Sequence, residues 1–237
     1  MSSLTPYWLL MPAAGTGSRF GGPIPKQHLP LADATVLEYS LRPFLTDSLC
    51  RGVVLAMAEG DERRSALRAT LPPSVCFVDG GAERVDSVLA ALDALKGLAA
   101  DEEWVLVHDA VRPCLAASDL KRLLQAGQTS ADGALLAAPV ADTLKRGGDD
   151  GSVASTVPRA GLWRALTPQM FRIGALRRAL LLARQGGRVP TDEAEAMEWQ
   201  GARPLLVAAG QSNIKITTVD DLPLAAAILI ARTGGAP

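Results

Sequence analysis

The sequence has few of the residues on which disulfide-stapled and metal-binding proteins depend. It contains two histidines and three cysteines, and the cysteines stand far apart at Cys50, Cys76 and Cys114. An odd number of isolated thiols without a CxxC pair argues against a disulfide framework and against a structural zinc site. Thiols of this kind are typical of a reducing compartment, so we expect a cytoplasmic protein.

Excess charge and long apolar segments are missing as well. The formal net charge is −1, which argues against the basic face that nucleic-acid-binding proteins usually carry. No apolar run reaches the length of a membrane span, and we expect no secretory segment. We therefore expect no nucleic-acid partner and no membrane association. The 237 residues, 48% of them hydrophobic, suffice for one sizeable core, so we predict a single domain over 1–237.

What the sequence does contain is a regular alternation of strand-like apolar runs and helical patterns. The runs that we predict as strands are 8–11, 53–57, 75–78, 104–107, 134–138 and 205–208. The helical patterns cover 36–45, 62–70, 84–95, 119–126, 174–184 and 193–200, and a further core helix begins near Leu224. Such alternation is typical of right-handed βαβ crossovers. It predicts an α/β fold with a mostly parallel sheet flanked by helices.

One segment, 140–164, interrupts this alternation. It carries the sequence GGDDG at 147–151 between two polar stretches, and Asp-Gly at a short turn is typical of a β-hairpin. An isolated hairpin is only marginally stable in water. We therefore predict an exposed β-arm that needs a partner surface, and a homodimer formed by exchanged arms would supply one.

Polar or glycine-rich motifs follow three of the predicted strands, at the edge where parallel sheets bind ligands. After the first strand, Gly15 and Gly17 allow the backbone to approach a ligand closely, and Arg19 and Lys26 can neutralise phosphate charge. The loop contains neither the GxxxxGK[ST] string of a Walker loop nor the GxGxxG string of dinucleotide-binding proteins. It therefore indicates triphosphate binding, with an ordinary turn carrying solvated cations as the alternative.

The second motif places Gly80 and Gly81 directly before a predicted helix. Two glycines at this point leave backbone N–H groups where a base or a ribose can dock, and Ser87 can hydrogen-bond to the same group. The alternative is a plain strand–helix turn in which Glu83 and Arg84 pair at the surface.

The third motif follows the strand predicted at 104–107. Asp109 stands where a carboxylate can reach a cation that bridges phosphates, because Mg²⁺ usually takes one or two carboxylates plus substrate oxygens. Arg112 can grip a second anionic group through two N–H groups. The alternative is that Asp109 caps the next turn and pairs with Arg112. We expect His108 to be structural, since no second His or Cys stands near it.

Further polar residues stand near the ends of predicted elements without a motif around them. They are Arg159, Thr167, Lys215 and the run Thr191-Asp192-Glu193. The run can be simple helix capping, and spacing alone assigns no function to any of these positions.

Taken together, the motifs resemble those of the 2-C-methyl-D-erythritol 4-phosphate cytidylyltransferase family. The resemblance extends from Met11 to about Leu229. Its strings, in order, are PAAGTGSRF with PKQ, GGAERVDSVLAAL, VHDAVRPC, PVADTLK, GLWRALTPQMF, TDEAEAMEW and NIKIT. It implies a Rossmann-like nucleotidyltransferase sheet flanked by helices, with the protruding β-arm at 140–164 serving dimerisation.

The resemblance also implies site residues. Arg19 and Lys26 match the catalytic cations that grip the triphosphate and stabilise the transition state. The matching nucleotide-binding positions are Ala13, Ala14, Gly15, Gly81, Arg84 and Ser87. The matching substrate-binding positions are Asp109, Ala110, Arg112, Thr143, Arg159, Thr167, Thr191 and Lys215, and the arm of one subunit presents Thr143 and Arg159 to its neighbour's site. Asp109 also matches the aspartate near Mg²⁺ or another divalent cation.

The implied reaction joins CTP to a polyol phosphate with release of pyrophosphate. The family's acceptor is 2-C-methyl-D-erythritol 4-phosphate, in the non-mevalonate isoprenoid pathway. One alternative is a cytidylyltransferase for another polyol phosphate, such as ribitol 5-phosphate. Another is a non-catalytic nucleotide-binding module. The joint presence of Arg19, Lys26 and Asp109 argues against that last alternative, because a pure binder needs no cations for a transition state.

Overall fold

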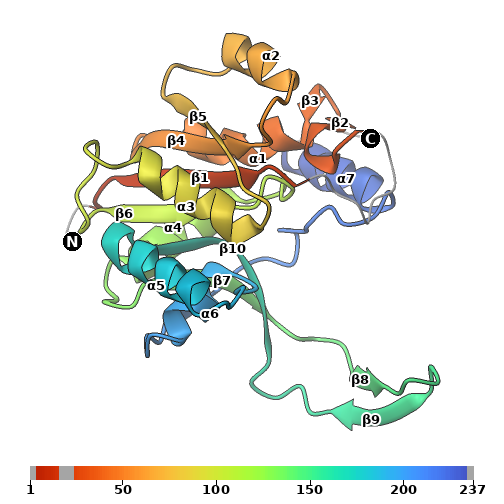
Figure 1. The fold of residues 1–237 in the computed structure, drawn as a ribbon. Coiled ribbons are helices and arrows are strands. Elements are labelled where there is room, and N and C mark those ends of the chain that lie inside the picture. Colours follow the sequence, from red (N-terminus) through yellow and green to blue (C-terminus); the bar gives the residue numbers. More distant parts are fainter. Residues whose placement is uncertain (1–3, 16–23, 234–237) are drawn as a thin grey trace.

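The structure, a computed structural model, describes residues 4–15 and 24–233. Its centre is a seven-stranded sheet with the strand order β11-β7-β10-β6-β1-β4-β5 (Figure 1). The strands of this sheet are β1 (Tyr7–Ala13), β4 (Cys50–Met57), β5 (Val75–Asp79), β6 (Trp104–Val107), β7 (Ala134–Pro139), β10 (Trp163–Arg172) and β11 (Leu205–Ala208). All six strands predicted from the sequence are therefore confirmed, and β10 is an addition.

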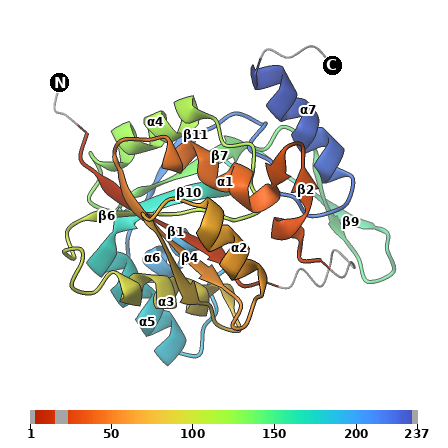
Figure 2. The ribbon, with the colours of Figure 1, turned by 90° about the horizontal axis from the view of Figure 1, so that it is seen from above.

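Helices cover both faces of the sheet, as the view from above shows (Figure 2). One face carries α1 (Val36–Leu45), α2 (Arg63–Thr70) and α4 (Ala117–Gly127). The other face carries α3 (Arg84–Ala94), α5 (Ile173–Gln185) and α6 (Glu193–Glu198). The six predicted helices are thus confirmed, with bounds that shift by one or two residues at several ends.

The two cores follow from alternation along the strands. In β1, Leu9 and Met11 point into the core beneath α1, while Leu10 points into the core beneath α3. Because both faces are covered, the strand is apolar throughout, as parallel strands usually are. At the start of α1, Thr35 and Glu38 form a capping box, in which each side chain accepts a hydrogen bond from the other residue's backbone N–H.

Strand β10 departs from the predicted alternation. It lies between β6 and β7 and pairs antiparallel with both. The β1–β4, β1–β6, β4–β5 and β7–β11 pairs are parallel, so the prediction of a mostly parallel sheet holds. The predicted arm, 140–164, was slightly too long, because its last residues, Trp163 and Arg164, already belong to β10.

The predicted hairpin arm is present and stands away from the body of the molecule (Figure 1). Its strands, β8 (Leu144–Gly147) and β9 (Val153–Val157), pair antiparallel with each other. Gly151 in the turn has a φ of 78°, a left-handed conformation that favours glycine. The shape of the arm is therefore confirmed, whereas dimerisation through it stays a prediction.

A smaller third core lies beside the sheet, under the C-terminal helix α7 (Asp221–Thr233). It joins α7 and α1 to the short strand β2 (Pro30–Leu31), which follows the single turn η2 (Lys26–His28) and pairs with β3 (Ala34–Thr35). The core helix predicted near the C-terminus is thus confirmed. In the part of the chain that the structure describes, no helix has the length and apolar character to cross a membrane.

Candidate active site

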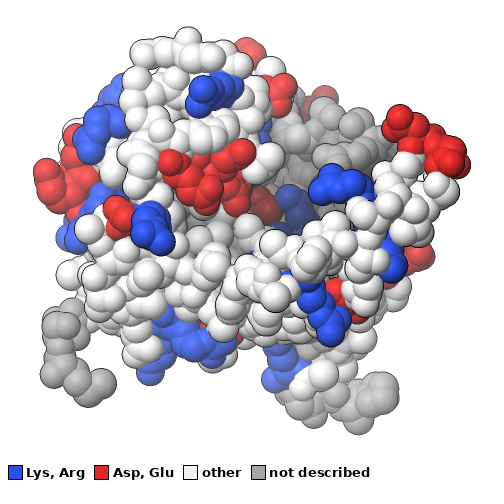
Figure 3. All heavy atoms as spheres, turned by 90° about the horizontal axis from the view of Figure 1, so that it is seen from below, with Lys and Arg blue, Asp and Glu red and all other residues white. Residues whose placement is uncertain are grey.

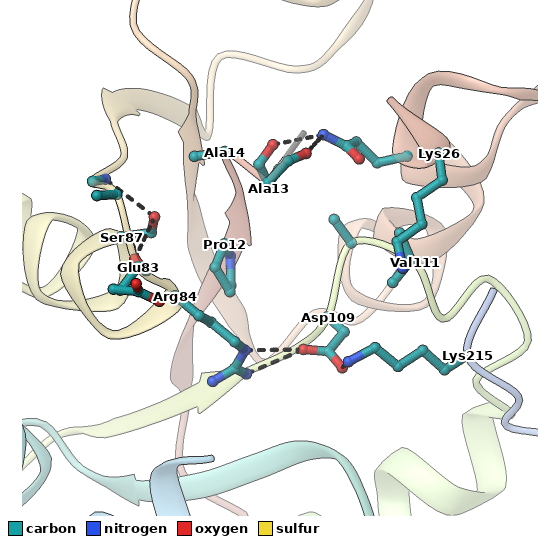
Figure 4. A pocket seen from close by; sticks show the side chains of 15 residues that line it. Pro12, Ala13, Ala14, Lys26, Glu83, Arg84, Ser87, Asp109, Val111 and Lys215 are labelled. Atoms are coloured by element: carbon teal, nitrogen blue, oxygen red, sulfur yellow. Dashed lines mark hydrogen bonds and ion pairs between the residues drawn. The ribbon is translucent and has the colours of Figure 1, made fainter. Parts of the chain in front are cut away.

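A pocket opens at the carboxyl ends of β1, β5 and β6 (Figure 4). Because these strands run parallel, the loops that follow them emerge at the same edge of the sheet. The described lining residues are Pro12, Ala13, Ala14, Gly15, Lys26, Gln27, Gly81, Ala82, Glu83, Arg84, Ser87, Asp109, Ala110, Val111 and Lys215. The three motifs predicted from the sequence therefore meet in one pocket.

Gln27, a residue to which the sequence assigned no role, joins the loop after β1 to η2. Gln27 is 4% exposed, and its amide nitrogen donates to the carbonyl oxygens of Ala13 and Gly15, both at 2.9 Å. These two bonds place Lys26, the neighbour of Gln27, at the pocket wall (Figure 4). Arg19, the other predicted catalytic cation, lies outside the described residues.

The loops after β1 and β5 approach each other closely. A Cβ atom at Gly80 would lie 2.5 Å from the Cβ of Ala14 and 2.7 Å from Oγ of Ser87, so a side chain there would push the two loops apart. Next to it, the backbone N–H of Gly81 donates to Oγ of Ser87 at 3.2 Å. The predicted nucleotide-binding positions at 13–15 and 81–87 are thus adjacent in space, and Gly80 is the residue whose small size allows it.

Asp109 lies at the centre of a group of cations (Figure 4). Its side chain is 9% exposed and lies 3.1 Å from Nη2 of Arg84, 3.0 Å from Nζ of Lys215 and 3.3 Å from Nε of Arg112. Burial acts to raise the pKa of Asp109, but the three cations hold that pKa well below its ordinary value of 3.8. Asp109 is therefore an ionised carboxylate at any pH near neutrality.

The backbone at Asp109 is held by strand β10. The N–H of Asp109 donates to Oγ1 of Thr167 at 3.1 Å, and that hydroxyl in turn donates to Nδ1 of His108 at 3.0 Å. Nε2 of His108 lies 3.2 Å from the carbonyl oxygen of Arg112, which can only accept, so Nε2 carries the proton. Burial lowers the pKa of His108 to about 4, so the ring is neutral and its role is structural. Thr167, which is 4% exposed, thus fixes the backbone of Asp109 through this hydrogen bond.

A second buried carboxylate, Glu193, stands behind this group. It is 1% exposed and forms an ion pair with Arg84. Burial raises the pKa of Glu193, and Arg84 opposes that rise. The surface pair of Glu83 and Arg84, stated as one alternative for this part of the sequence, is wrong, since Arg84 pairs with Asp109 and Glu193.

Five of the eight predicted substrate-binding residues are absent from the described lining of the pocket. Two of them, Arg112 and Thr167, contact Asp109 directly. Thr143 and Arg159 belong to the arm region, where both are exposed and Arg159 donates to the carbonyl oxygen of Ala141. Thr191 precedes α6, and its backbone N–H donates to the carboxylate of Glu195 at 2.6 Å. Seen from below, the face between body and arm is hollowed, and Lys and Arg side chains lie in the hollow (Figure 3).

The acidic side chains of the pocket fit a cation that arrives with its ligand. Within residues 4–15 and 24–233, no three His, Cys, Asp or Glu side chains are grouped so as to hold a metal by themselves. Asp109 is the buried carboxylate of the pocket, and Glu83 is at its rim. One or two carboxylates with phosphate oxygens and water are what Mg²⁺ usually takes. The pocket therefore fits Mg²⁺ bound to a polyphosphate.

Comparison with known proteins agrees with this arrangement. Residues 7–231 match the model of the family described as 2-C-methyl-D-erythritol 4-phosphate cytidylyltransferase. A protein of that name from Acidithiobacillus ferrooxidans is 50% identical over 231 residues, which cover 95% of this chain and 97% of the relative. A protein of the same name from Pseudomonas putida is 49% identical over 92% of this chain and 94% of its own length.

Solved structures give the same result for the fold. A crystal structure of a 4-diphosphocytidyl-2C-methyl-D-erythritol synthase, 36% identical, superimposes with a TM-score of 0.84 over 95% of this chain and 99% of that one. The 2-C-methyl-D-erythritol 4-phosphate cytidylyltransferase of Francisella tularensis, 31% identical, gives 0.81 over 94% of this chain and 100% of its own.

Proposed function

The chain belongs to the 2-C-methyl-D-erythritol 4-phosphate cytidylyltransferase family, and from this membership we propose how each side of its pocket contributes to the reaction. The enzyme transfers the cytidylyl group of CTP to 2-C-methyl-D-erythritol 4-phosphate in isoprenoid precursor synthesis. An oxygen of the acceptor phosphate forms a bond to the α-phosphorus of CTP. The bond from that phosphorus to the oxygen that bridges it to the β-phosphorus breaks, and pyrophosphate leaves with the electron pair. The observation that carries this reading is the meeting of the Lys26 loop and the Asp109 cations in one pocket.

On the nucleotide side, the loops at 13–15 and 81–87 supply backbone N–H groups and small residues. These suit close contact with a triphosphate and a pyrimidine. Lys26 adds a cation at the same wall, and Arg19 is the second predicted cation of that loop. The acceptor phosphate is already anionic near neutral pH, so the reaction needs no strong general base. Catalysis then consists of positioning and of charge stabilisation.

On the acceptor side, Lys215 and Arg112 are the cations that can bind the sugar phosphate. In the structure both lie against Asp109. An incoming phosphate offers them a second counter-ion, and Asp109 then orients their N–H groups toward it. Thr167 holds the backbone of Asp109 in this place.

Mg²⁺, or another divalent cation, would be held mainly by the phosphates of CTP, with Asp109 as the protein carboxylate nearest to it. When bound, the ion neutralises charge on the triphosphate and on the leaving pyrophosphate. Free thiols at Cys50, Cys76 and Cys114 support a cytoplasmic location for the enzyme.

A panel of acceptors tests the substrate. We expect release of pyrophosphate from CTP and Mg²⁺ with 2-C-methyl-D-erythritol 4-phosphate, and little release with ribitol 5-phosphate, since the relatives that match this chain are named for the former. Release without any acceptor, or with ribitol 5-phosphate alone, would contradict the assignment. Binding of CTP without release under any condition would favour a nucleotide-binding module.

A mixed dimer tests the arm. If Thr143 and Arg159 of one subunit complete the site of the other, a dimer of one Lys26→Ala and one Arg159→Ala subunit contains one intact site and one doubly impaired site. Equal co-expression should therefore restore about one quarter of wild-type turnover, because half of the dimers are mixed and each has one working site. The measurement is pyrophosphate release from the mixture and from each variant alone. Absence of rescue would mean that every site is built from a single chain.

A further inference from the structure

Glu193 is a buried carboxylate that has no role in the cytidylyl transfer described above. Its side chain is 1% exposed, and it faces the guanidinium of Arg84 with both oxygens, Oε2 at 3.0 Å from Nη2 and Oε1 at a close contact with Nη1. The same guanidinium contacts Oδ1 of Asp109 through Nε at 3.2 Å and through Nη2 at 3.1 Å. Arg84 therefore bridges two carboxylates, one behind the pocket and one inside it.

The bridge uses most of the donors that arginine has. A guanidinium carries five N–H groups in one plane. Four of them are directed at Glu193 and Asp109, which leaves one N–H on Nη1 among the described contacts. The plane of Arg84 is consequently fixed by Glu193 and Asp109 together.

Glu193 in turn is held by strand β10. The amide of Gln169, which is 1% exposed, accepts from the N–H of Ala194 at 2.8 Å and donates to Oδ2 of Asp192 at 2.8 Å. The other oxygen of Asp192 accepts from the N–H of Glu195 at 2.9 Å and so caps α6. The residues on either side of Glu193 are thus fixed to the sheet, and a continuous path of contacts runs from β10 through Glu193 and Arg84 to Asp109.

We propose that Glu193 is a positioning residue for cytidylyl transfer, which acts by fixing Arg84 so that Asp109 and the cations of the acceptor site keep their productive places. It links α6, the helix that follows Thr191, with α3, the helix that begins beside the nucleotide loop. This inference rests on the function proposed above.

The charges predict a distinctive kinetic result. Arg84, Arg112 and Lys215 share Asp109 and Glu193, three cations with two carboxylates. Glu193→Gln removes one negative charge and leaves the volume of the side chain nearly unchanged. The site becomes more positive, so the acceptor phosphate should bind no more weakly and its KM should stay or fall. The freed guanidinium loses its fixed plane, and a displacement of this kind lowers kcat by about 10- to 100-fold.

The experiment compares Glu193→Gln with Glu198→Gln, a matched change at an exposed position of the same helix. Pyrophosphate release is measured for both variants and the wild type over ranges of CTP and sugar phosphate, together with the melting temperature. We expect a lower kcat without a rise in the acceptor KM for Glu193→Gln, and wild-type constants for Glu198→Gln. A wild-type kcat for Glu193→Gln would overturn the proposal. A wild type without activity would instead contradict the proposed function.

Arg84→Lys provides the second arm and remains informative if Glu193→Gln does not fold. Lysine is a single point charge and cannot bridge both carboxylates. We expect Arg84→Lys to lower kcat with little change in the KM for CTP, and the double variant to lose no more than Arg84→Lys alone. A higher KM for CTP at full kcat would show that Arg84 acts on the nucleotide directly and would overturn the proposal. So would a double variant whose loss equals the product of the two single losses, because Glu193 would then act independently of Arg84.

Discussion

Replacing Lys26 with methionine is expected to lower kcat by about 10²–10³-fold, which corresponds to about 3–4 kcal/mol in the barrier. Methionine keeps most of the length of the side chain and removes the charge. Lys26 lines the pocket, on the η2 turn that Gln27 fastens to Ala13 and Gly15. A cation held in this way is already in place when charge moves toward the leaving pyrophosphate, so its removal affects the transition state more than the bound substrates.

Lys121→Met is the matched control, because Lys121 is exposed on α4. It should retain the wild-type kcat. The measurement is steady-state pyrophosphate release with saturating CTP and acceptor, with the melting temperature as a check on folding. A kcat for Lys26→Met within a factor of about two of the wild type would remove Lys26 from the catalytic group, since the loss of one preorganised donor costs far more than that.

Asp109→Asn is expected to lower the free energy of unfolding by about 3 kcal/mol at neutral pH, because it leaves buried cations without their shared carboxylate. Arg112 is 10% exposed and bears most of that cost, whereas Arg84 and Lys215 are 29% and 44% exposed and are partly relieved by water. Turnover of the sugar phosphate should fall as well, because Arg112 and Lys215, which we propose to bind its phosphate, lose the carboxylate that orients them. Asp93→Asn, at an exposed position of α3, is the control and should change neither quantity.

The difference in the free energy of unfolding between the wild type and Asp109→Asn should depend on pH, which is a separate test of Asp109. The cations hold the pKa of Asp109 in the folded protein well below the ordinary value of 3.8. A carboxyl of this kind contributes stability that is fully present above about pH 5 and is lost progressively as the pH falls further, because the unfolded chain then binds the proton first. Urea unfolding of wild type and Asp109→Asn should therefore give curves that differ by a constant amount above pH 5 and converge below pH 4. A difference that stays constant down to pH 3 would contradict the proposed ion pairing.

Local pattern was sufficient for most of the secondary structure. Helix α1 has its predicted bounds because a capping box at Thr35 and an apolar stripe are both short-range features. Strand β10 escaped prediction because it contains Pro168 and two buried polar residues, Thr167 and Gln169, which are typical of a loop. The structure accommodates the proline where the pairing with β7 shifts register, between Ala165 and Gln169.

In the candidate site as well, the sequence predicted the residues that short-range patterns mark and missed a contact between distant parts of the chain. The loop at 13–15, the glycines at 80 and 81 and the carboxylate at 109 were found because each directly follows an apolar strand. Glu193 was read as part of a helix cap. Asp192 and Glu195 do form that cap, but the side chain of Glu193 turns inward to Arg84, which is 109 positions away in the chain. No spacing in the sequence indicates a contact of that range.

The sequence by itself determined most of the elements, the glycine loop and the family, because these depend on neighbouring residues and on strings that are read in order. Only the tertiary structure decided which charges meet at Asp109. Arg84, Thr167 and Lys215 reach it from three separate parts of the chain, and Glu193 is joined to it through Arg84. Thr167 lies there because β10 inserts antiparallel between β6 and β7. Ion pairing depends on distance in space, and the strand order that sets this distance is a property of the whole sheet.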